Sequence, residues 1–268
     1  MDVRKTYKLF VNGEFVRSES GRAYRPDGIV NVPRGSRKDL RDAVRAARTA
    51  FPSWAARTAM NRGQILYRAA EMLDSRGAQF MDLLGGGAKA RREVEQAVET
   101  LVWYAGWTDK LPQVAGTVNP VAGPYFNFTL PEPTGVVAIV APDEPSLGGM
   151  VRRLAPALCG GNVVVALAPE SRPLPALTLA EVFATSDFPA GVVNVLSGQR
   201  RELLPWLAAH MDVNAIDVAG CTHDEVKAVE AAAADNVKRV IKVAPGESSP
   251  YLITAFMEMK TVWHPIGV

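Results

Sequence analysis

The stretch DVAGCTHDEV, residues 217–226, places a cysteine directly after a glycine and two residues before a histidine. A thiol becomes a good nucleophile when a nearby base or a helix N-terminus lowers its pKa. Cys221 and His223 could therefore form a nucleophile and its base. Asp224 and Glu225 follow at once, and their negative charge would raise the pKa of the thiol again. We therefore interpret Cys221 as a small residue at a turn and His223 as a solvated residue of a first helical turn.

Other reactive side chains give no stronger pattern. Cys159 ends an apolar helical stretch, where a buried small residue is the favoured interpretation. Asp143 and Glu144 are adjacent carboxylates that could act as an acid and base pair, but we favour a role in capping the helix that begins near Ser146. The two cysteines and three histidines show no metal-ligand spacing. We expect neither a disulfide framework nor a metal site.

Composition narrows the class of protein. The chain has 268 residues, of which 48% are hydrophobic and 22% charged, which suits one large globular domain or two modest ones. Its formal charge of +2 comes without a dense cluster of Lys or Arg, so we expect no nucleic-acid partner. The sequence shows no signal peptide and no apolar run of the roughly 18 residues that span a bilayer. We therefore expect a cytoplasmic protein with no membrane partner.

Five short apolar runs alternate with helical stretches between residues 135 and 245: GVVAIVAP, NVVVALAP, GVVNVLSG, VNAIDVAG and KRVIKVAP. Runs that are apolar on both faces are typical of a parallel sheet covered by helices. The pattern predicts an α/β fold with a doubly wound, Rossmann-like parallel sheet of the cofactor-binding type. Ligands of such sheets lie beyond the carboxyl ends of the strands. The turns after the five runs are therefore where function is expected, and Cys221 follows the fourth.

The flanking regions predict further elements. YKLFVNGEFV alternates around an Asn-Gly pair, which predicts a β-hairpin. The first 110 residues are otherwise mostly helical, with Ser36 as the first helix cap and a break at residues 85–87. Residues 115–133 and the tail TAFMEMKTVWHPIGV have strand character and predict a protruding β arm that a partner must cover. Its large apolar side chains are Tyr125, Phe126, Phe128, Trp263 and Ile266.

Six segments in this order and spacing resemble the aldehyde dehydrogenase superfamily: YKLFVNGEFV, NRGQILYRAAEML, PTGVVAIVAP, RLAPALCGGNVVVALAPES, PAGVVNVLSG and KTVWHPIG. The chain has about half the usual length of that family. In the family, a domain with the nucleophilic cysteine precedes the C-terminal strand, whereas here Pro250 is followed almost at once by that strand. The resemblance implies a cofactor-type domain of residues 1–112 and 131–249, an oligomerisation arm with the C-terminal strand of residues 113–130 and 250–268, and an absent catalytic domain.

The resemblance also places cofactor-binding positions in the turns. These are Pro142, Glu144, Leu167, Glu170, Gly198, Gly220 and Cys221. Glu144 replaces an Asn that donates to an oxyanion, and Leu167 replaces a Lys that holds the adenosine ribose, whereas Glu170 keeps its family type. Arg200 replaces a glycine after the third strand. Val243 falls near the family's general base and cannot take a proton, so Glu144 and Val243 are degenerate positions and we expect no catalytic residue.

Three hypotheses follow from these departures. The favoured one is a pseudoenzyme, by family an NAD(P)-dependent aldehyde oxidoreductase but inactive alone, which forms a homo-oligomer or a hetero-oligomer with a full-length aldehyde dehydrogenase. Its terminal strand would join a sheet edge of the partner's catalytic domain. The alternatives are an NAD(P)-dependent aldehyde oxidoreductase with a reduced site that uses Cys221 or an unrecognised residue, and a nucleotide-binding regulatory module. Because Asp224 and Glu225 would repel a pyrophosphate, we expect no cofactor, although the resemblance implies NAD or NADP.

Overall fold

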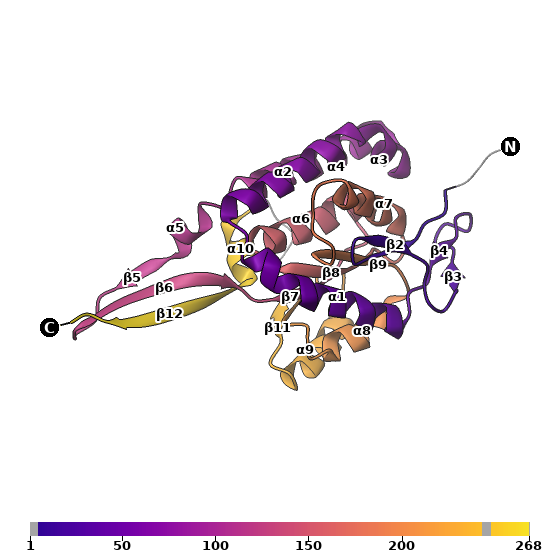
Figure 1. Cartoon of the computed structure of the whole chain (residues 1–268). Helices are drawn as coiled ribbons and strands as arrows, with labels where there is room; N and C mark the ends of the chain where they lie inside the picture. The colour runs from indigo at the N-terminus through magenta and orange to yellow at the C-terminus, as the bar shows by residue number, and fades with distance from the viewer. Residues whose placement is uncertain (1–4, 243–247, 268) are drawn as a thin grey trace.

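A seven-stranded sheet of order β11-β10-β7-β8-β9-β1-β2 forms the centre of the molecule (Figure 1). The structure is a computed structural model, which describes residues 5–242 and 248–267. The five predicted runs form five parallel strands, which confirms the doubly wound α/β fold. These strands are β7 (Val136–Val140), β8 (Val163–Leu167), β9 (Val193–Leu196), β10 (Ala215–Asp217) and β11 (Arg239–Ile241).

The N-terminal hairpin extends this sheet with two antiparallel strands, β1 (Leu9–Val11) and β2 (Glu14–Val16). Asn12 and Gly13 both have a positive φ, as a two-residue Asn-Gly turn requires. The hairpin was predicted, but its pairing with β9 was not, because alternation within a hairpin says nothing about which strand lies beside it. Two short strands, β3 (Ala23–Tyr24) and β4 (Val32–Pro33), form a separate ribbon.

Helices cover both faces of the sheet (Figure 1). One face carries α6 (Ser146–Cys159) and α7 (Pro173–Ala184), outside which lie α2 (Ala59–Ser75), α3 (Gly77–Leu83) and α4 (Gly87–Ala105). The other face carries α1 (Arg37–Ala55), α8 (Arg200–Ala209) and α9 (His223–Ala234). None of these helices, as far as the chain is described, is long and apolar enough to cross a membrane.

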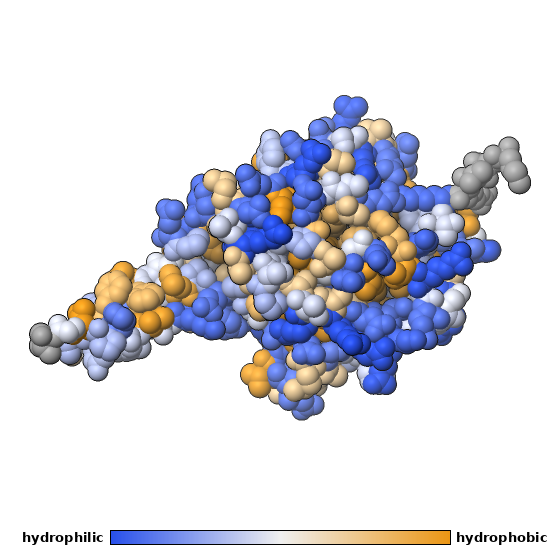
Figure 2. Space-filling model, viewed as in Figure 1, coloured by the Kyte–Doolittle hydropathy of each residue, from blue (hydrophilic) through white to orange (hydrophobic). Residues whose placement is uncertain are grey.

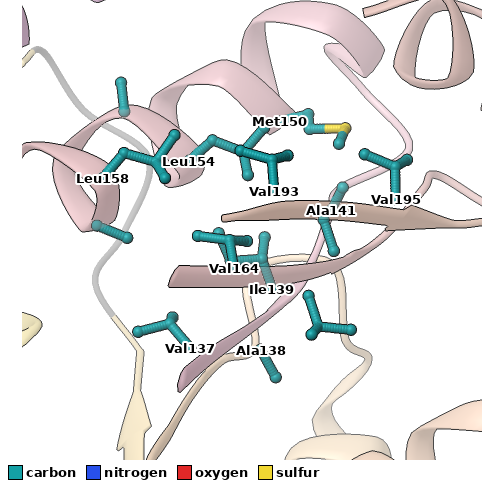
Figure 3. Close-up of a cluster of buried hydrophobic side chains, with 14 of the residues drawn as sticks. Val137, Ala138, Ile139, Ala141, Met150, Leu154, Leu158, Val164, Val193 and Val195 are labelled. Carbon is teal, nitrogen blue, oxygen red and sulfur yellow. The ribbon is translucent and has the colours of Figure 1, made fainter. Parts of the chain in front are cut away.

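The core lies between α6 and the sheet and is almost entirely aliphatic (Figure 3). Met150 and Leu154 of α6 pack over Ile139 and Val164, and all four side chains are fully buried. Every residue of β7 and β8 is buried, which explains why these strands read as unbroken apolar runs rather than alternating ones. Each such side chain contributes about 1.5–3 kcal/mol on burial.

The predicted cap of α1 is present as a reciprocal capping box. The Ser36 hydroxyl accepts from the Asp39 backbone N–H, and the Asp39 carboxylate accepts from the Ser36 N–H at 2.7 Å. Ser18 also donates to this carboxylate, so the buried charge has several partners. Such a cap satisfies the N–H groups that the first helical turn leaves free.

The predicted arm is a three-stranded antiparallel sheet that projects from the body (Figure 1). Its strands are β5 (Thr117–Asn119), β6 (Tyr125–Pro133) and β12 (Met257–Pro265). Two short helices, α5 (Leu111–Ala115) and α10 (Pro250–Ala255), lie at its base, and α10 leads through Phe256 directly into β12.

The terminal strand does not need a partner's sheet in order to pair. β12 pairs with β6 of the same chain along its whole length, from Met257 opposite Pro133 to Pro265 opposite Tyr125. The pairing with β6 was not predicted, and the prediction that this strand also joins a partner's sheet edge is left open by it. β12 remains an edge strand, and its outer backbone groups face away from β6.

Candidate functional site at the carboxyl edge of the sheet

The strand order contains a point, between β7 and β10, where the connections that follow two neighbouring parallel strands run to opposite sides. β7 continues through α6 to β8 on one side, whereas β10 lies on its other side and is reached from β9 through α8. Ligands of open α/β sheets bind at this kind of switch point, beyond the carboxyl ends of the strands. We call residues 141–146, 168–172, 197–200 and 218–225, which follow β7 to β10, the carboxyl edge.

Gly220 holds the two central turns of the carboxyl edge together. Its backbone N–H donates to the carbonyl of Val140 at 2.8 Å. A Cβ at Gly220 would lie 2.2 Å from the carbonyl oxygen of Ala141, far inside van der Waals contact. Only glycine therefore permits this approach of the turn after β10 to the end of β7.

One arginine joins all four turns, because it lies in one of them and contacts the other three. Arg200 begins α8, and its backbone N–H donates to the Glu170 carboxylate at 2.8 Å. Its guanidinium donates to Asp143 at 3.1 Å and lies 3.7 Å from Glu225. Burial would raise the pKa of Asp143, but hydrogen bonds from Ser171 and the charge of Arg200 outweigh it and hold that pKa below its ordinary value.

Asp143 and Glu144, which follow β7, were predicted to cap α6. This prediction is wrong, because neither side chain bonds to the start of that helix. Asp143 accepts from the backbone N–H and hydroxyl of Ser171 in the next turn. Glu144 is exposed and pairs with Arg172 and, at 3.6 Å, with Lys89. The free N–H groups of the first turn of α6 are instead bound by Glu93.

Glu93 reaches the start of α6 from α4, which packs against it. One carboxylate oxygen of Glu93 accepts from the Leu147 and Gly148 N–H groups at 2.8 and 3.1 Å. Glu170 accepts from the first N–H of α8, and Glu225 accepts from the Thr222 N–H at the start of α9. Three helix N-termini at the carboxyl edge are therefore each capped by a glutamate of the chain itself. Those N–H groups are the ones that anions use in folds of this class.

Cys221 lies on the turn before α9 and is half-buried. Burial, and after it the charge of Glu225, raises the pKa of the thiol to about 12. Glu225 accepts from the Thr222 N–H at 2.8 Å and closes a capping box. His223 and Asp224 are exposed residues of the first turn, as expected for His223. The interpretation of Cys221 as a turn residue rather than a thiolate nucleophile is supported by this environment.

The rate of alkylation by iodoacetamide tests whether the pKa of the Cys221 thiol is raised. At pH 8 we expect modification of Cys221 in the folded chain to be at least about tenfold slower than in the unfolded chain, whose thiols titrate near 8.5. The rate should still rise between pH 9 and 10. Peptide mass spectrometry separates Cys221 from Cys159, which is fully buried. A rate that is already constant below pH 8 would show an activated thiolate instead.

The other predicted positions lie in or next to the same turns, except Val243. Pro142 and Glu144 follow β7, Leu167 is the last residue of β8, and Gly198 follows β9. Val243 lies outside the residues that the structure describes. No group of three or more metal-binding side chains gathers within the described ranges.

A family model described as the aldehyde dehydrogenase family matches residues 17–263. The chain belongs to the aldehyde dehydrogenase family. Retinal dehydrogenase 2 from Homo sapiens is 34% identical over 266 residues, which cover 94% of this chain and 51% of that protein. Omega-crystallin from Enteroctopus dofleini is 33% identical over 249 residues, which cover 88% of this chain and 50% of that protein. This aldehyde dehydrogenase family member thus spans about half the length of these relatives.

Solved aldehyde dehydrogenase structures share the fold and correct one expectation. The NAD+ complex of aldehyde dehydrogenase from Bacillus cereus superposes with a TM-score of 0.81 and 28% identity, over 88% of this chain and 50% of that one. PnpE in complex with nicotinamide adenine dinucleotide gives 0.80 and 28%, with the same coverage. These neighbours contradict the expectation that no cofactor binds, and point to NAD(P). The acidic first turn of α9 was given too much weight, because the capping box and Arg200 already partner Glu225.

The carboxyl edge of this aldehyde dehydrogenase family member fits a dinucleotide in part. Glu170 offers a carboxylate that could accept from hydroxyl groups, and Gly220 keeps the central turn close to the sheet. At the start of α9, the Glu225 carboxylate holds the Thr222 N–H, one of the groups that an anion could use.

Sequence reasoning missed a buried ion pair beneath this edge. Asp217 ends β10 and is fully buried, and its carboxylate lies 3.4 Å from the Arg153 guanidinium of α6. Burial, against the charge of Arg153, raises the pKa of Asp217 to about 6. A charged residue at the end of the apolar run VNAIDVAG was the available signal, since a buried charge needs a partner.

Proposed function

We propose that the chain is an NAD(P)-binding member of the aldehyde dehydrogenase family that does not turn over aldehydes by itself and acts as a subunit. It assembles through the β arm, either with itself or with a full-length aldehyde dehydrogenase. The observation that carries the proposal is the exposed apolar surface of the projecting arm. Residues directly opposite one another in a sheet share a face, so the register of the arm sorts its side chains.

One face of the arm carries an apolar row that crosses all three strands. Val118, Phe128 and Val262 lie opposite one another in register. Phe126 and Leu130 lie on the same face because they are two residues from Phe128. Four of these five side chains are between 41% and 68% exposed, and hydrophobic side chains are seen gathered on the arm in Figure 2. An apolar row of this kind on a projecting sheet favours a protein partner.

The opposite face of the arm is mixed: a row of threonines crosses it, and Tyr125, Met259 and Trp263 on the same face are between 43% and 59% exposed. Thr117, Thr129 and Thr261 form the corresponding row, and the Thr129 and Thr261 hydroxyls are 2.8 Å apart. Asn119 donates to Asn127 and Thr129. Large apolar side chains are thus exposed on both faces, and the row through Val118, Phe128 and Val262 is the one that crosses all three strands without a polar residue. The open edge of β12 offers backbone groups to the same partner, by strand addition.

The absence of turnover is inferred from the environment of the candidate groups. The Cys221 thiol is protonated at neutral pH, because its pKa is raised to about 12. Glu144 can only accept hydrogen bonds when ionised, and it is engaged by Arg172. Neither group would serve as the nucleophile or the oxyanion donor of an aldehyde dehydrogenase.

Titration calorimetry with NAD+ and NADP+, followed by a turnover assay, tests the enzymatic part of the proposal. We expect saturable binding of at least one dinucleotide and no aldehyde-dependent formation of NAD(P)H by the isolated chain. Aldehyde-dependent reduction that disappears in Cys221→Ser would support the reduced oxidoreductase instead. Lack of binding by both dinucleotides would remove the cofactor from the proposal and leave assembly to be tested separately.

A further inference from the structure

We propose that a groove between α1 and α8 binds an organic anion with a flat apolar body, that is, an aromatic carboxylate or phosphate. The groove is separate from the carboxyl edge, because none of its lining residues belongs to the four turns that form that edge. The inference therefore depends neither on the proposed NAD(P) binding nor on assembly through the arm. It rests on the size of the groove, its apolar wall, its charge and the placement of Arg37.

The size of the groove is that of a small-molecule site. Its volume is about 650 Å³, within the range of roughly 300–1,000 Å³ that is typical of ligand clefts. The start of α1 contributes residues 37–41, and the end of α8 with the turn after it contributes residues 206–211 (Figure 1). Residues 37–41 extend only about 6 Å along the axis of α1. The groove therefore suits a molecule of one or two rings, and it is too short to seat a helix or a strand.

The wall of the groove is largely apolar. Leu40 is buried, whereas the Trp206 and Met211 side chains on the α8 side are 43% and 75% exposed. Apolar surface in contact with water is unfavourable, and a ring system that lay against these side chains would remove part of it from water. This wall therefore favours a ligand with a flat apolar body.

The charge of the groove favours an anion. Among the described residues, three basic side chains and no carboxylate line it. Lys38 pairs with Glu19 at 2.6 Å and Arg41 with Asp42 at 2.9 Å, but all four side chains are between 45% and 57% exposed. Exposed ion pairs of this kind contribute little, so both cations are available to a ligand. Arg37, the third cation, has no ion pair with any residue of the described chain.

Trp206 holds the Arg37 guanidinium in place. The central carbon of the guanidinium lies over the indole ring, 3.6 Å from its centroid, which is a stacking contact. This contact uses one face of the guanidinium and leaves its N–H groups, which lie in the plane, without a hydrogen-bond partner among the described residues. A guanidinium fixed in this way presents paired donors that match two oxygens of a carboxylate or phosphate.

The placement of these cations is not explained by the stability of α1. The N-terminus of a helix carries a partial positive charge, which favours acidic side chains there and disfavours basic ones. Arg37 and Lys38 are nevertheless the first two residues of α1, and Arg41 lies one turn further along the helix. A bound anion would offset this unfavourable charge. The same feature of the sequence that weakens the helix therefore suits the proposed ligand.

Titration calorimetry with 1-naphthyl phosphate, 1-naphthoate and 1-naphthol at pH 7.5 tests the proposal on the full chain. The three probes share one ring system, but the first two are anions and the third is neutral. We expect both anions to bind with a dissociation constant on the order of 1 mM or below. We expect 1-naphthol to bind about tenfold more weakly, because it lacks the charge-assisted contact. The anion that binds more tightly distinguishes a phosphate from a carboxylate ligand.

Two substitutions locate the binding in the groove. Arg37→Met keeps the length of the side chain and should weaken both anions about tenfold, so that the preference over 1-naphthol is lost. Trp206→Ala should weaken all three probes, because it removes the stacking surface. Arg45→Met is the matched control and should bind like the wild type, since Arg45 is an exposed arginine of α1 outside the groove. Arg37 and Trp206 are exposed, so the urea midpoint of each variant should stay close to that of the wild type.

Three results would overturn the proposal, and none of them bears on NAD(P) binding. The first is that neither anion binds the wild type at concentrations up to about 10 mM. The second is that 1-naphthol binds as tightly as the anions, which would make the groove merely apolar. The third is that both anions bind Arg37→Met as they bind the wild type, or that Arg45→Met weakens them equally. Saturating NAD+ should leave the binding of both anions unchanged, and competition by NAD+ would place the probes at the carboxyl edge instead.

Discussion

Replacement of Arg153 by leucine is expected to lower the free energy of unfolding by about 3–5 kcal/mol at pH 8, because it leaves the Asp217 carboxylate buried without its cation. Arg153 and Asp217 join α6 to β10, and their side chains are 4% and 0% exposed. Urea unfolding, which gives the free energy by linear extrapolation, measures the loss. Arg152→Leu is the matched control, because Arg152 is the neighbouring arginine on the same helix and its side chain reaches Gln96 near the surface.

The loss should be smaller at pH 5 than at pH 8. In the wild type the pKa of Asp217 is raised from 3.8 to about 6, so the group's contribution to stability is complete below pH 3.8 and is lost as the pH rises through 6. Without Arg153 that pKa rises further, and at pH 5 the carboxyl is neutral. A loss that is equal at both pH values would mean that packing, not charge, explains the effect.

A second pair of substitutions should separate the two faces of the arm. Val118→Asp places a carboxylate in the apolar row, and we expect the dissociation constant of the assembly to rise about a hundredfold or more, because an unpaired charge would be buried. Thr117→Asp adds the same charge to the adjacent residue of β5, in the threonine row of the opposite face, and should leave assembly unchanged. Sedimentation at several concentrations measures both.

Both residues are exposed at the edge of the arm, so neither substitution should change the fold of the isolated chain. If Val118→Asp and Thr117→Asp weaken the assembly equally, the partner does not bind specifically to the apolar row. Phe126→Asp provides an independent check, since Phe126 lies on the apolar face of the neighbouring strand and is 45% exposed. It should behave like Val118→Asp.

The parallel sheet could be predicted from the sequence because its pattern is local. β7 and β8 are buried at every position, so each reads as a run of apolar residues whatever lies beside it. The hairpin around Asn12 and Gly13 and the cap at Ser36 are local as well, and both were predicted. The place of the hairpin beside β9 depends on residues about 180 positions away, and no local pattern encodes it.

The site was predicted less completely because its contacts join distant turns. The turns themselves were expected, but Arg200 was seen only as a lost glycine. Its contacts with Asp143 and Glu225 arise because α6, α8 and α9 all begin at one edge of the sheet. The cap on α6 was assigned to the nearest carboxylates, whereas Glu93 reaches it from α4 across 54 residues. Asp224 and Glu225 in the first turn of α9 were expected to repel a pyrophosphate, because the ion pair of Glu225 with Arg200 was not foreseen.

Light scattering after size exclusion tests the central claim most directly, with the chain purified alone and after co-expression with a full-length aldehyde dehydrogenase from the same genome. A free chain has a mass of 28.9 kDa. The account predicts a mass that is a multiple of this value, or a mixed complex containing both chains, and a return to 28.9 kDa in Val118→Asp. A wild-type chain that remains at 28.9 kDa in both preparations would contradict it.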